Sequence, residues 1–411
     1  MCYVSHYNVQ LYRKGGHHPV YLGDVLNDRF EVVHKLGSGG FGLVWLCYDN
    51  VHQKWRAVKI MTANQSKGSR EEKIYDHLRK AASLKKLQDI LPVLGGRVDQ
   101  WRMGLKPHEQ QMSGNVQTFC FQVTEAVRFL HHSRICHGDL KPGNILLTVP
   151  SSIENMGREE MKELLGEPET WAVETRSGDP PAPRGPEYIV CPPQNYWWKK
   201  YIAGSIAIID FAAAFVVGDQ PGSGVWPIGY AAPEVMFCGK DLRGCHSDIW
   251  SLAATLFEIG TEDSFFGGET MVIKQAPYRR GRFKMLASHY GWKDDTEEIP
   301  FKLGEPIDVS AWNSCPVEWK DYDQLLKTRE RLIDGTGHTN ILAAVIGRQK
   351  HRYAESVPGE LERIELKYQY PRKDVIQLAD LLGQMIHYDP AKRITIEDVF
   401  LHPCLGGPTS T

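Results

Sequence analysis

A glycine-rich segment is the first group of residues whose spacing suggests chemistry. Gly37, Gly39 and Gly42 stand in a GxGxxGxV pattern that ends at Val44. Because glycine has no side chain, such a turn lets backbone N–H groups approach and bind phosphate groups closely. The same spacing occurs in plain turns and in dinucleotide-binding proteins, where it opens a helix. The pattern alone leaves a plain turn, a dinucleotide site and another nucleotide site open.

The residues after the glycines favour a site for the phosphates of ATP. LVWLCYD continues as a β-strand instead of a helix, and Ala57-Val58-Lys59 falls on the next apolar strand. A lysine at the end of a strand is ordinarily solvated, but here it is placed to pair with the α- and β-phosphates. The residues predicted to contact ATP in this region are Leu36, Gly37, Ser38, Gly39, Gly40, Phe41, Gly42, Leu43, Val44, Ala57 and Lys59.

Lys59 should be paired by a carboxylate from the next helix, which we expect over residues 69–87. Glu71 and Glu72 are the candidates. Glu71 has Ile74 at the offset of an inward-facing stripe, whereas Glu72 is explained as a capping residue. Two solvated acids that only favour the helix dipole are the plainer alternative. We choose Glu71 as the partner of Lys59 and as part of the ATP site.

The strongest signal in the chain is HGDLKPGN at residues 137–144, between a helix that ends in FLHHSRI and the strand ILL. It resembles the H-R-D-L-x-x-x-N catalytic loop of protein kinases. The resemblance implies that Asp139 accepts the proton of a substrate hydroxyl and that Lys141 offsets charge on the transferred phosphoryl group. It also implies that Asn144 binds Mg²⁺ through its carbonyl oxygen, and Lys141 indicates Ser/Thr specificity. A chance polar turn is the plain alternative.

A second metal ligand is predicted after the apolar strand IAII. Asp210-Phe211-Ala212 stands in for the kinase D-F-G, so Asp210 is expected to bind the Mg²⁺ that bridges the β- and γ-phosphates. An Asp at a strand end is otherwise only a turn residue. Ala212 replaces glycine, which removes easy access to a positive φ and should limit flipping of Phe211.

Further motifs predict how the site is regulated and held. Gly138 stands where most kinases carry an arginine that grips a phosphorylated activation loop, so no such phosphate should be needed. Glu234 in APE should form a buried pair with Arg393 in DPAKRIT. Asp248 in SDIWSLA should cap the catalytic loop from below.

The elements that position these residues indicate an α+β chain with a small β-rich lobe followed by a larger helical lobe, and the resemblance to protein kinases implies their bilobal fold. Strand-like runs occupy residues 30–60, and helical patterns dominate after residue 246. The Pro- and Gly-rich residues 148–203 are interpreted as a surface insertion with one short helix at 159–165. Other helices are predicted over 115–131, 248–259, 374–387 and 395–400. The predicted domains are a lead-in over 1–29, a small β-rich N-lobe over 30–94, a helical C-lobe over 95–405 and a tail over 406–411.

A narrower resemblance rests on the lead-in. YRKGGHHPVYLGD at residues 12–24 looks like the YxxGGYHPVxxGD segment of SR-protein kinases, which also lack the arginine that Gly138 replaces. HGDLKPGNILL followed by a long insertion with LLGEPET is similar to fungal members. The resemblance implies phosphorylation of Ser, and less often Thr, in Arg/Ser-rich proteins such as splicing factors.

The N-lobe departs from the family after the helix at residues 69–87. LPVLG resembles the family's hinge and follows that helix almost directly, so two of five sheet strands are missing from the pattern. Nucleotide affinity should suffer first. This leaves an active Mg-ATP-dependent Ser/Thr kinase and a catalytically impaired pseudokinase that acts as a protein-binding scaffold. A dinucleotide-dependent oxidoreductase is a third hypothesis, but it leaves residues 137–144 unexplained.

Composition narrows the setting. A net charge of −2 gives no reason to expect nucleic acid or anionic lipid as a partner. The nine cysteines show no CxxC spacing, which is typical of a reduced intracellular protein. The N-terminus lacks a signal-peptide pattern, and the longest apolar stretch, residues 205–217, is too short to cross a bilayer. We therefore expect a monomer in the cytoplasm or nucleus, with protein substrates.

Overall fold

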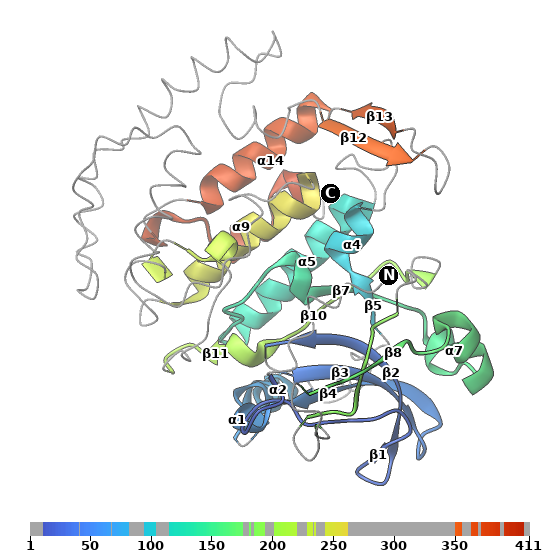
Figure 1. Cartoon of the computed structure of the whole chain (residues 1–411). Helices are drawn as coiled ribbons and strands as arrows, with labels where there is room; N and C mark the ends of the chain where they lie inside the picture. The colour runs from blue at the N-terminus through green and yellow to red at the C-terminus, as the bar shows by residue number, and fades with distance from the viewer. Residues whose placement is uncertain are drawn as a thin grey trace. The chain divides into compact units, whose positions relative to one another are not determined.

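In the computed structural model, the chain divides into two compact units. Figure 1 shows the helices and strands of the described residues. The N-terminal unit comprises residues 1–96 and 146–207, and the C-terminal unit comprises residues 97–145 and 208–411. The structure describes residues 11–40, 42–66, 68–81, 94–103, 115–175, 181, 185–193, 201–219, 228–232, 234–235, 243–261, 350–355, 363–368, 371–386 and 390–406.

An antiparallel sheet with the strand order β1-β2-β3-β4 forms the N-terminal unit. β2 to β4 are rich in β-branched and aromatic residues, and they confirm the strands predicted between residues 30 and 60. The lead-in adds β1, which pairs with β2. The residues after the helix, where two strands are missing from the sequence pattern, lie outside the described part. The strands are β1 (Val25–Leu26), β2 (Phe30–Gly39), β3 (Gly42–Asp49) and β4 (Lys54–Met61).

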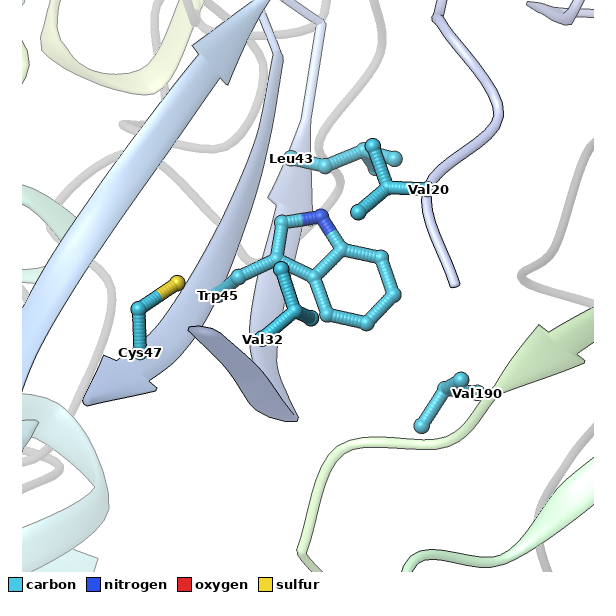
Figure 2. Packing of buried hydrophobic residues seen from close by; sticks show 6 residues of the cluster. All are labelled: Val20, Val32, Leu43, Trp45, Cys47 and Val190. Atoms are coloured by element: carbon cyan, nitrogen blue, oxygen red, sulfur yellow. The ribbon is translucent and has the colours of Figure 1, made fainter. Parts of the chain in front are cut away.

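One face of this sheet carries a hydrophobic cluster. Side chains on a strand alternate between faces, so Leu43, Trp45 and Cys47 of β3 point to the same side. Figure 2 shows the Trp45 ring beside Val20 and near Val190. Val20 comes from the lead-in and Val190 from the insertion, so both segments belong to this core.

The insertion packs on the sheet through polar contacts as well. Trp55 of β4 donates its indole N–H to the carbonyl of Met156 at 2.8 Å. Arg158 donates to both carboxylate oxygens of Glu31 at 3.0 and 2.9 Å. The sequence analysis assigned this segment to the C-lobe, whereas its contacts group it with the N-terminal unit. It forms α6 (Ser151–Glu154), α7 (Arg158–Leu165) and an antiparallel hairpin of β8 (Thr170–Ala172) and β9 (Tyr188–Val190); α7 confirms the predicted helix.

Two helices follow β4. The predicted helix at 69–87 begins as expected, and its described part ends at Ala81. Its buried residues are Glu71, Ile74 and Leu78, which confirms the predicted inward stripe. The helices are α1 (Ala63–Ser66) and α2 (Arg70–Ala81).

Helices build most of the described part of the C-terminal unit. α5 contacts α9 and α15, and α14 contacts α9; Figure 1 labels α5, α9 and α14. α5 buries one stripe of apolar side chains, as its helical periodicity predicts. The three other predicted helices of this unit are confirmed, although residue 387 lies outside the described part. The elements are α4 (Val98–Met103), α5 (Asn115–His132), α9 (Cys245–Thr261), α14 (Arg372–Met385), α15 (Ile396–Phe400) and a hairpin of β12 (Lys350–Glu355) and β13 (Arg363–Tyr368).

Short strands flank the two segments that carry the predicted catalytic residues. One sheet has the order β10-β7-β5, and β11 pairs with β6. Residues 137–144 therefore lie between β6 and β7, and residues 209–214 lie between β10 and β11. The strands are β5 (Leu94–Arg97), β6 (Ile135–Cys136), β7 (Ile145–Thr148), β10 (Ile206–Ile208) and β11 (Phe215–Val216).

Candidate active site

The catalytic loop is attached to a buried carboxylate on α9. Asp248, which is 1% exposed, accepts the backbone N–H groups of His137 at 2.7 Å and Gly138 at 2.9 Å. Its Oδ2 also lies 3.2 Å from Nε2 of His131 on α5. Burial acts to raise the pKa of Asp248, but the hydrogen bond and charge of His131 outweigh it and lower that pKa. The carboxylate therefore stays ionised and holds the start of the loop.

His131 is a member of the site that the sequence analysis missed. Burial acts to lower its pKa, but the hydrogen bond and charge of Asp248 raise it overall. The signal was present in the sequence, because His131 lies in the last turn of a helix that leads directly to the loop. Its role depends on α9 being packed beside α5, which no local pattern reveals.

His137 links the loop to the strand that precedes Asp210. Its Nδ1 accepts the N–H of Asp139 at 3.2 Å, and its Nε2 lies 3.1 Å from the carbonyl oxygen of Ile209. Only a ring that is unprotonated at Nδ1 and protonated at Nε2 satisfies both contacts. The ring also packs against Phe211, with centroids 5.1 Å apart. One side chain thus fixes both segments of the site.

The two carboxylate oxygens of Asp139 differ in their hydrogen bonds. Its Oδ2 accepts hydrogen bonds from Lys141 Nζ at 2.6 Å and from Asn144 Nδ2 at 3.0 Å. Its Oδ1 is buried and has no hydrogen-bond partner within the part of the chain that the structure describes. A buried carboxylate oxygen without a donor is costly unless a ligand supplies one. Within the described residues, Oδ1 is therefore a buried acceptor that still lacks a donor.

Asn144 and Asp210 lie on segments joined by a backbone hydrogen bond. The N–H of Ile209 donates to the carbonyl of Asn144 at 2.9 Å. The Asn144 amide nitrogen is turned to Asp139, where it donates to the backbone carbonyl at 2.8 Å, so its side-chain oxygen faces away from these contacts. Asp210 has φ 67° and ψ 68°, a left-handed conformation that is uncommon outside glycine. Such backbone strain is concentrated at functional sites.

These two residues fit a magnesium ion better than a metal that needs a complete protein cage. Over the described ranges, no three His, Cys, Asp or Glu side chains gather as a metal site. Mg²⁺ needs only one or two protein ligands when phosphate oxygens and water supply the rest. One carboxylate and one amide oxygen match that requirement.

Ala212 causes no strain at the glycine position of the D-F-G pattern. It lies in a short 3-10 helix, Phe211–Ala213, and its φ is not among the positive values of the described residues. The left-handed residue of this segment is Asp210 instead. The replacement of glycine by Ala212 therefore does not distort the segment.

Gly138 fits its position for a backbone reason. It has φ 75°, and a Cβ built there would lie 2.7 Å from the carbonyl oxygen of Ala213. Any larger residue requires the loop or the Ala213 carbonyl to move. The backbone geometry here therefore favours glycine over the arginine that most kinases carry.

Glu234, which ends the predicted activation segment (residues 210–234), is held by a buried ion pair. Arg393 donates to both oxygens of Glu234 at 2.6 Å, and to the carbonyl of His246 at 2.9 Å. Both side chains are almost fully buried. The contact that the sequence analysis predicted between Glu234 and Arg393 is present, while Pro233 lies outside the described residues.

The N-terminal unit carries the predicted lysine and its carboxylate. Lys59 Nζ lies 2.8 Å from Glu71 Oε2, and Glu71 is 6% exposed. Glu72 instead is exposed, and its backbone N–H points to Ser69 Oγ at 3.4 Å. Of the two acids considered, Glu71 is therefore the one that contacts Lys59.

Three of the predicted ATP contacts share one face of the sheet. Lys59 pairs with Val44 and Ala57 pairs with Leu46 in the β3–β4 register. Val58 and Ile60, which alternate with them, pack against the hydrophobic cluster on the other face. Val44, Ala57 and Lys59 thus point away from the hydrophobic cluster.

The glycine-rich segment lies at the β2–β3 turn. An added Cβ at Gly42 would lie 2.4 Å from the carbonyl of Ile60, so this glycine allows β3 to approach β4. At Gly37, Gly39 and Gly40 an added Cβ would meet no atom of the described residues within 4 Å, which leaves room for a ligand. Leu36 lies at a bulge, Ser38 is exposed, Leu43 is in the core, and Phe41 lies outside the described part.

Comparison with known proteins decides the family. The model of the protein kinase domain matches residues 30–154 and 193–405. This chain belongs to the protein kinase domain family. The match is interrupted between residues 154 and 193, within the segment interpreted as an insertion.

The chain resembles SR-protein kinases, as its lead-in motif predicted. The kinase domain is 31% identical to SRSF protein kinase 3 of Homo sapiens over 202 residues, which is 42% of this chain and 33% of that protein. It is also 31% identical to serine/threonine-protein kinase spk-1 of Caenorhabditis briggsae over 178 residues, 37% of this chain and 15% of that protein. The chain therefore spans about a third or less of the length of these relatives.

The fold is that of a kinase domain. A crystal structure of a kinase domain matches with a TM-score of 0.50 and 20% identity, covering 95% of this chain and 98% of that chain. This confirms the predicted α+β, bilobal kinase fold. No helix in the described ranges is long and apolar enough to cross a membrane.

Proposed function

We propose that this kinase domain transfers the γ-phosphate of ATP to Ser or Thr hydroxyl groups of protein substrates. The observation that carries the proposal is the state of Asp139. One of its oxygens is held by Lys141 and Asn144, and the other is buried without a donor in the described residues. A substrate hydroxyl is the donor that completes this arrangement.

In the proposed reaction, the substrate hydroxyl donates its hydrogen bond to Asp139 Oδ1. As the hydroxyl oxygen attacks the γ-phosphorus, its proton passes to Asp139 and the bond to the bridging oxygen of ADP breaks. Lys141, already 2.6 Å from Asp139, places a positive charge beside the transferred group. This charge favours the transition state because negative charge spreads over the phosphoryl oxygens.

Asn144 and Asp210 are the residues that would hold Mg²⁺. When bound, the metal neutralises phosphate charge and orients the triphosphate for in-line transfer. The left-handed backbone of Asp210 supports this assignment because such conformations are concentrated at functional sites. The amide nitrogen of Asn144 supports it because it donates to Asp139 and so leaves the side-chain oxygen of Asn144 facing away from that contact.

The N-terminal unit would contribute the contacts to the nucleotide. Lys59 is oriented by Glu71, and a lysine held in this way is pre-organised to bind phosphate oxygens. The open positions at Gly37, Gly39 and Gly40 support backbone contacts to the phosphates. Ala57 and Val44 share the face of Lys59 and would pack against the base.

The proposed substrates are Arg/Ser-rich proteins. This rests on the likeness to SRSF protein kinase 3 and on the lead-in motif at residues 12–24. Ser/Thr rather than Tyr as the acceptor rests on Lys141, which occupies the position typical of Ser/Thr kinases.

Transfer of radiolabelled γ-phosphate to an Arg/Ser peptide tests the proposal. The wild-type protein with Mg-ATP should label the peptide on serine, and Asp139→Ala should not. Equal labelling by both proteins would refute it. A thermal-shift titration with millimolar Mg-ATP adds the second arm, because a scaffold without nucleotide binding would show no stabilisation.

Two neighbouring acids provide a matched pair of variants for the nucleotide half. Glu71→Gln removes the partner of Lys59, so the KM for ATP should rise about tenfold or more. Glu72→Gln changes an exposed acid on the same helix turn and should leave the KM within about twofold. Similar effects of both substitutions would contradict the role assigned to the Lys59–Glu71 pair.

A further inference from the structure

Two cysteines that are far apart in the sequence meet beside the catalytic loop. The Sγ atoms of Cys136 and Cys245 lie 3.5 Å apart, although 109 positions separate the residues. Cys136 is buried in β6, directly before His137, and Cys245 is the first residue of α9. Cys245 is only partly buried, so a small reagent can reach it.

The surroundings divide the two thiols into an attacking and a resolving group. The hydrogen bond from Cys136, assisted by the charge of His131, lowers the pKa of Cys245 to about 7 despite its burial. The same hydrogen bond, together with burial, raises the pKa of Cys136. Among the described residues, the charge of Asp248 also acts on both sulfurs and opposes thiolate formation. Cys245 is thus the more nucleophilic thiol near neutral pH.

We propose that Cys136 and Cys245 form a reversible disulfide under hydroperoxide, and that this disulfide lowers the activity of the catalytic loop. The second half of the proposal rests on the proposed kinase function, whereas the disulfide itself does not.

The chemistry balances with hydrogen peroxide as the oxidant. The Cys245 thiolate attacks one peroxide oxygen, the O–O bond breaks, and the departing hydroxide takes up a proton to form water. The resulting sulfenic acid is then attacked by the Cys136 sulfur; the S–O bond breaks, and a second water forms with the thiol proton. Two thiols and one hydrogen peroxide thus give one disulfide and two waters, and an added dithiol reverses the reaction.

The position of the pair explains the expected effect. His137 and Gly138 directly follow Cys136, and their backbone N–H groups donate hydrogen bonds to Asp248. Asp248 lies one helical turn after Cys245. A covalent S–S bond of about 2 Å is shorter than the present contact, so its formation draws the two sulfurs together and pulls β6 toward the start of α9. Asp139 moves with that loop, and a displacement of about 1 Å can cost on the order of 100-fold in rate.

The test compares the whole 411-residue chain before and after treatment with hydrogen peroxide. Non-reducing peptide mapping should find a Cys136–Cys245 cross-link in the wild type, and dithiothreitol should remove it. The cross-link should be absent in Cys245→Ser and present in Cys404→Ser, which changes a buried cysteine elsewhere in the same unit. Failure to form the cross-link at peroxide levels that oxidise other accessible dithiols would overturn the proposal.

Two readouts measure the effect on the catalytic loop. Kinase activity, normalised to that of each reduced variant, should fall at least about tenfold in oxidised wild type and stay unchanged in oxidised Cys245→Ser. Amide hydrogen exchange of residues 135–144 should change in the same samples, and it needs no kinase activity. If the reduced protein does not transfer phosphate, only the proposed kinase function fails. The amide hydrogen exchange then still shows whether the disulfide alters the catalytic loop. A cross-linked protein with unchanged exchange would overturn the effect on the loop.

Discussion

The catalytic loop and the insertion are both held against neighbouring elements, but by different kinds of interaction. Buried charges hold the loop and the activation segment: Asp248 accepts two backbone N–H groups, and Arg393 binds Glu234. The insertion instead adds Val190 to a hydrophobic cluster and makes a half-exposed ion pair between Arg158 and Glu31. The difference suggests that the C-terminal unit needs a fixed geometry around its polar groups, whereas the insertion needs only to stay attached.

The largest expected effect comes from breaking the buried ion pair. Arg393→Met leaves the Glu234 carboxylate buried without its partner, which should cost about 3–5 kcal/mol of unfolding free energy. Urea denaturation measures this. Adding Glu234→Gln should restore part of the loss, because the unpaired charge is removed. A double variant that is less stable than the sum of both single variants would contradict this reasoning.

The backbone of the catalytic loop provides the next test. Gly138→Ala places a Cβ against the Ala213 carbonyl at a positive φ, so the free energy of unfolding should fall by about 1–3 kcal/mol. Gly143→Ala in the same loop is the matched control, because its Cβ would meet only Lys141 Cε at 4.0 Å. Equal melting temperatures for the two variants would show that Gly138 is not conformationally required.

A core truncation tests the attachment of the insertion. Val190→Ala removes two buried methyl groups from the hydrophobic cluster. The free energy of unfolding should therefore fall by about 1.5 kcal/mol. Val51→Ala, at a side chain that is 65% exposed, should cost less than about 0.5 kcal/mol. If the two variants unfold at the same denaturant concentration, the insertion does not pack on the sheet as described.

The half-exposed ion pair should matter less. Arg158→Met removes the contact to Glu31, and pairs of this kind contribute about 0–1 kcal/mol. The loss should shrink further at high salt, since ions screen exposed charges. A salt-independent loss larger than that of Val190→Ala would reverse the order proposed for the two kinds of contact.

The smallest expected effect is a pH slope from His131. Its pKa is raised above 6.5 in the folded protein, so its contribution is complete below about pH 6.5 and is lost as pH rises through the folded pKa. Stability measured between pH 6 and 9 should therefore decline in Cys245→Ser, a background in which the neighbouring thiol cannot titrate. Adding His131→Gln should flatten that part of the curve, and an unchanged slope would assign it to another group.

Much of the C-terminal unit could be predicted because its signals are local. The spacing of Asp139, Lys141 and Asn144 identifies the loop, and the apolar stripe of α5 predicts its helix from periodicity alone.

In the N-terminal unit, Glu71 could be preferred over Glu72 because only Glu71 lies on the buried stripe of α2.

The contacts that escaped prediction join segments distant in sequence. Nothing in the Pro- and Gly-rich residues 148–203 indicates that Val190 packs beside Trp45 or that Arg158 reaches Glu31. His131 and Asp248 are 117 positions apart, and Cys136 and Cys245 meet only because β6 lies beside the start of α9. Such pairings depend on how helices and strands pack against one another. No local pattern in the sequence specifies that packing.

The most direct test of the account is a steady-state comparison of wild type with Asp139→Asn, using Mg-ATP and an Arg/Ser peptide. The substitution keeps the size of the side chain but removes the proton acceptor, so kcat should fall by at least about 100-fold. The KM for ATP should stay within about threefold, since Asp139 is proposed to act on the substrate hydroxyl. An unchanged kcat, or no detectable transfer by the wild type under conditions where Mg-ATP stabilises it, would contradict the assignment of Asp139 as the catalytic base.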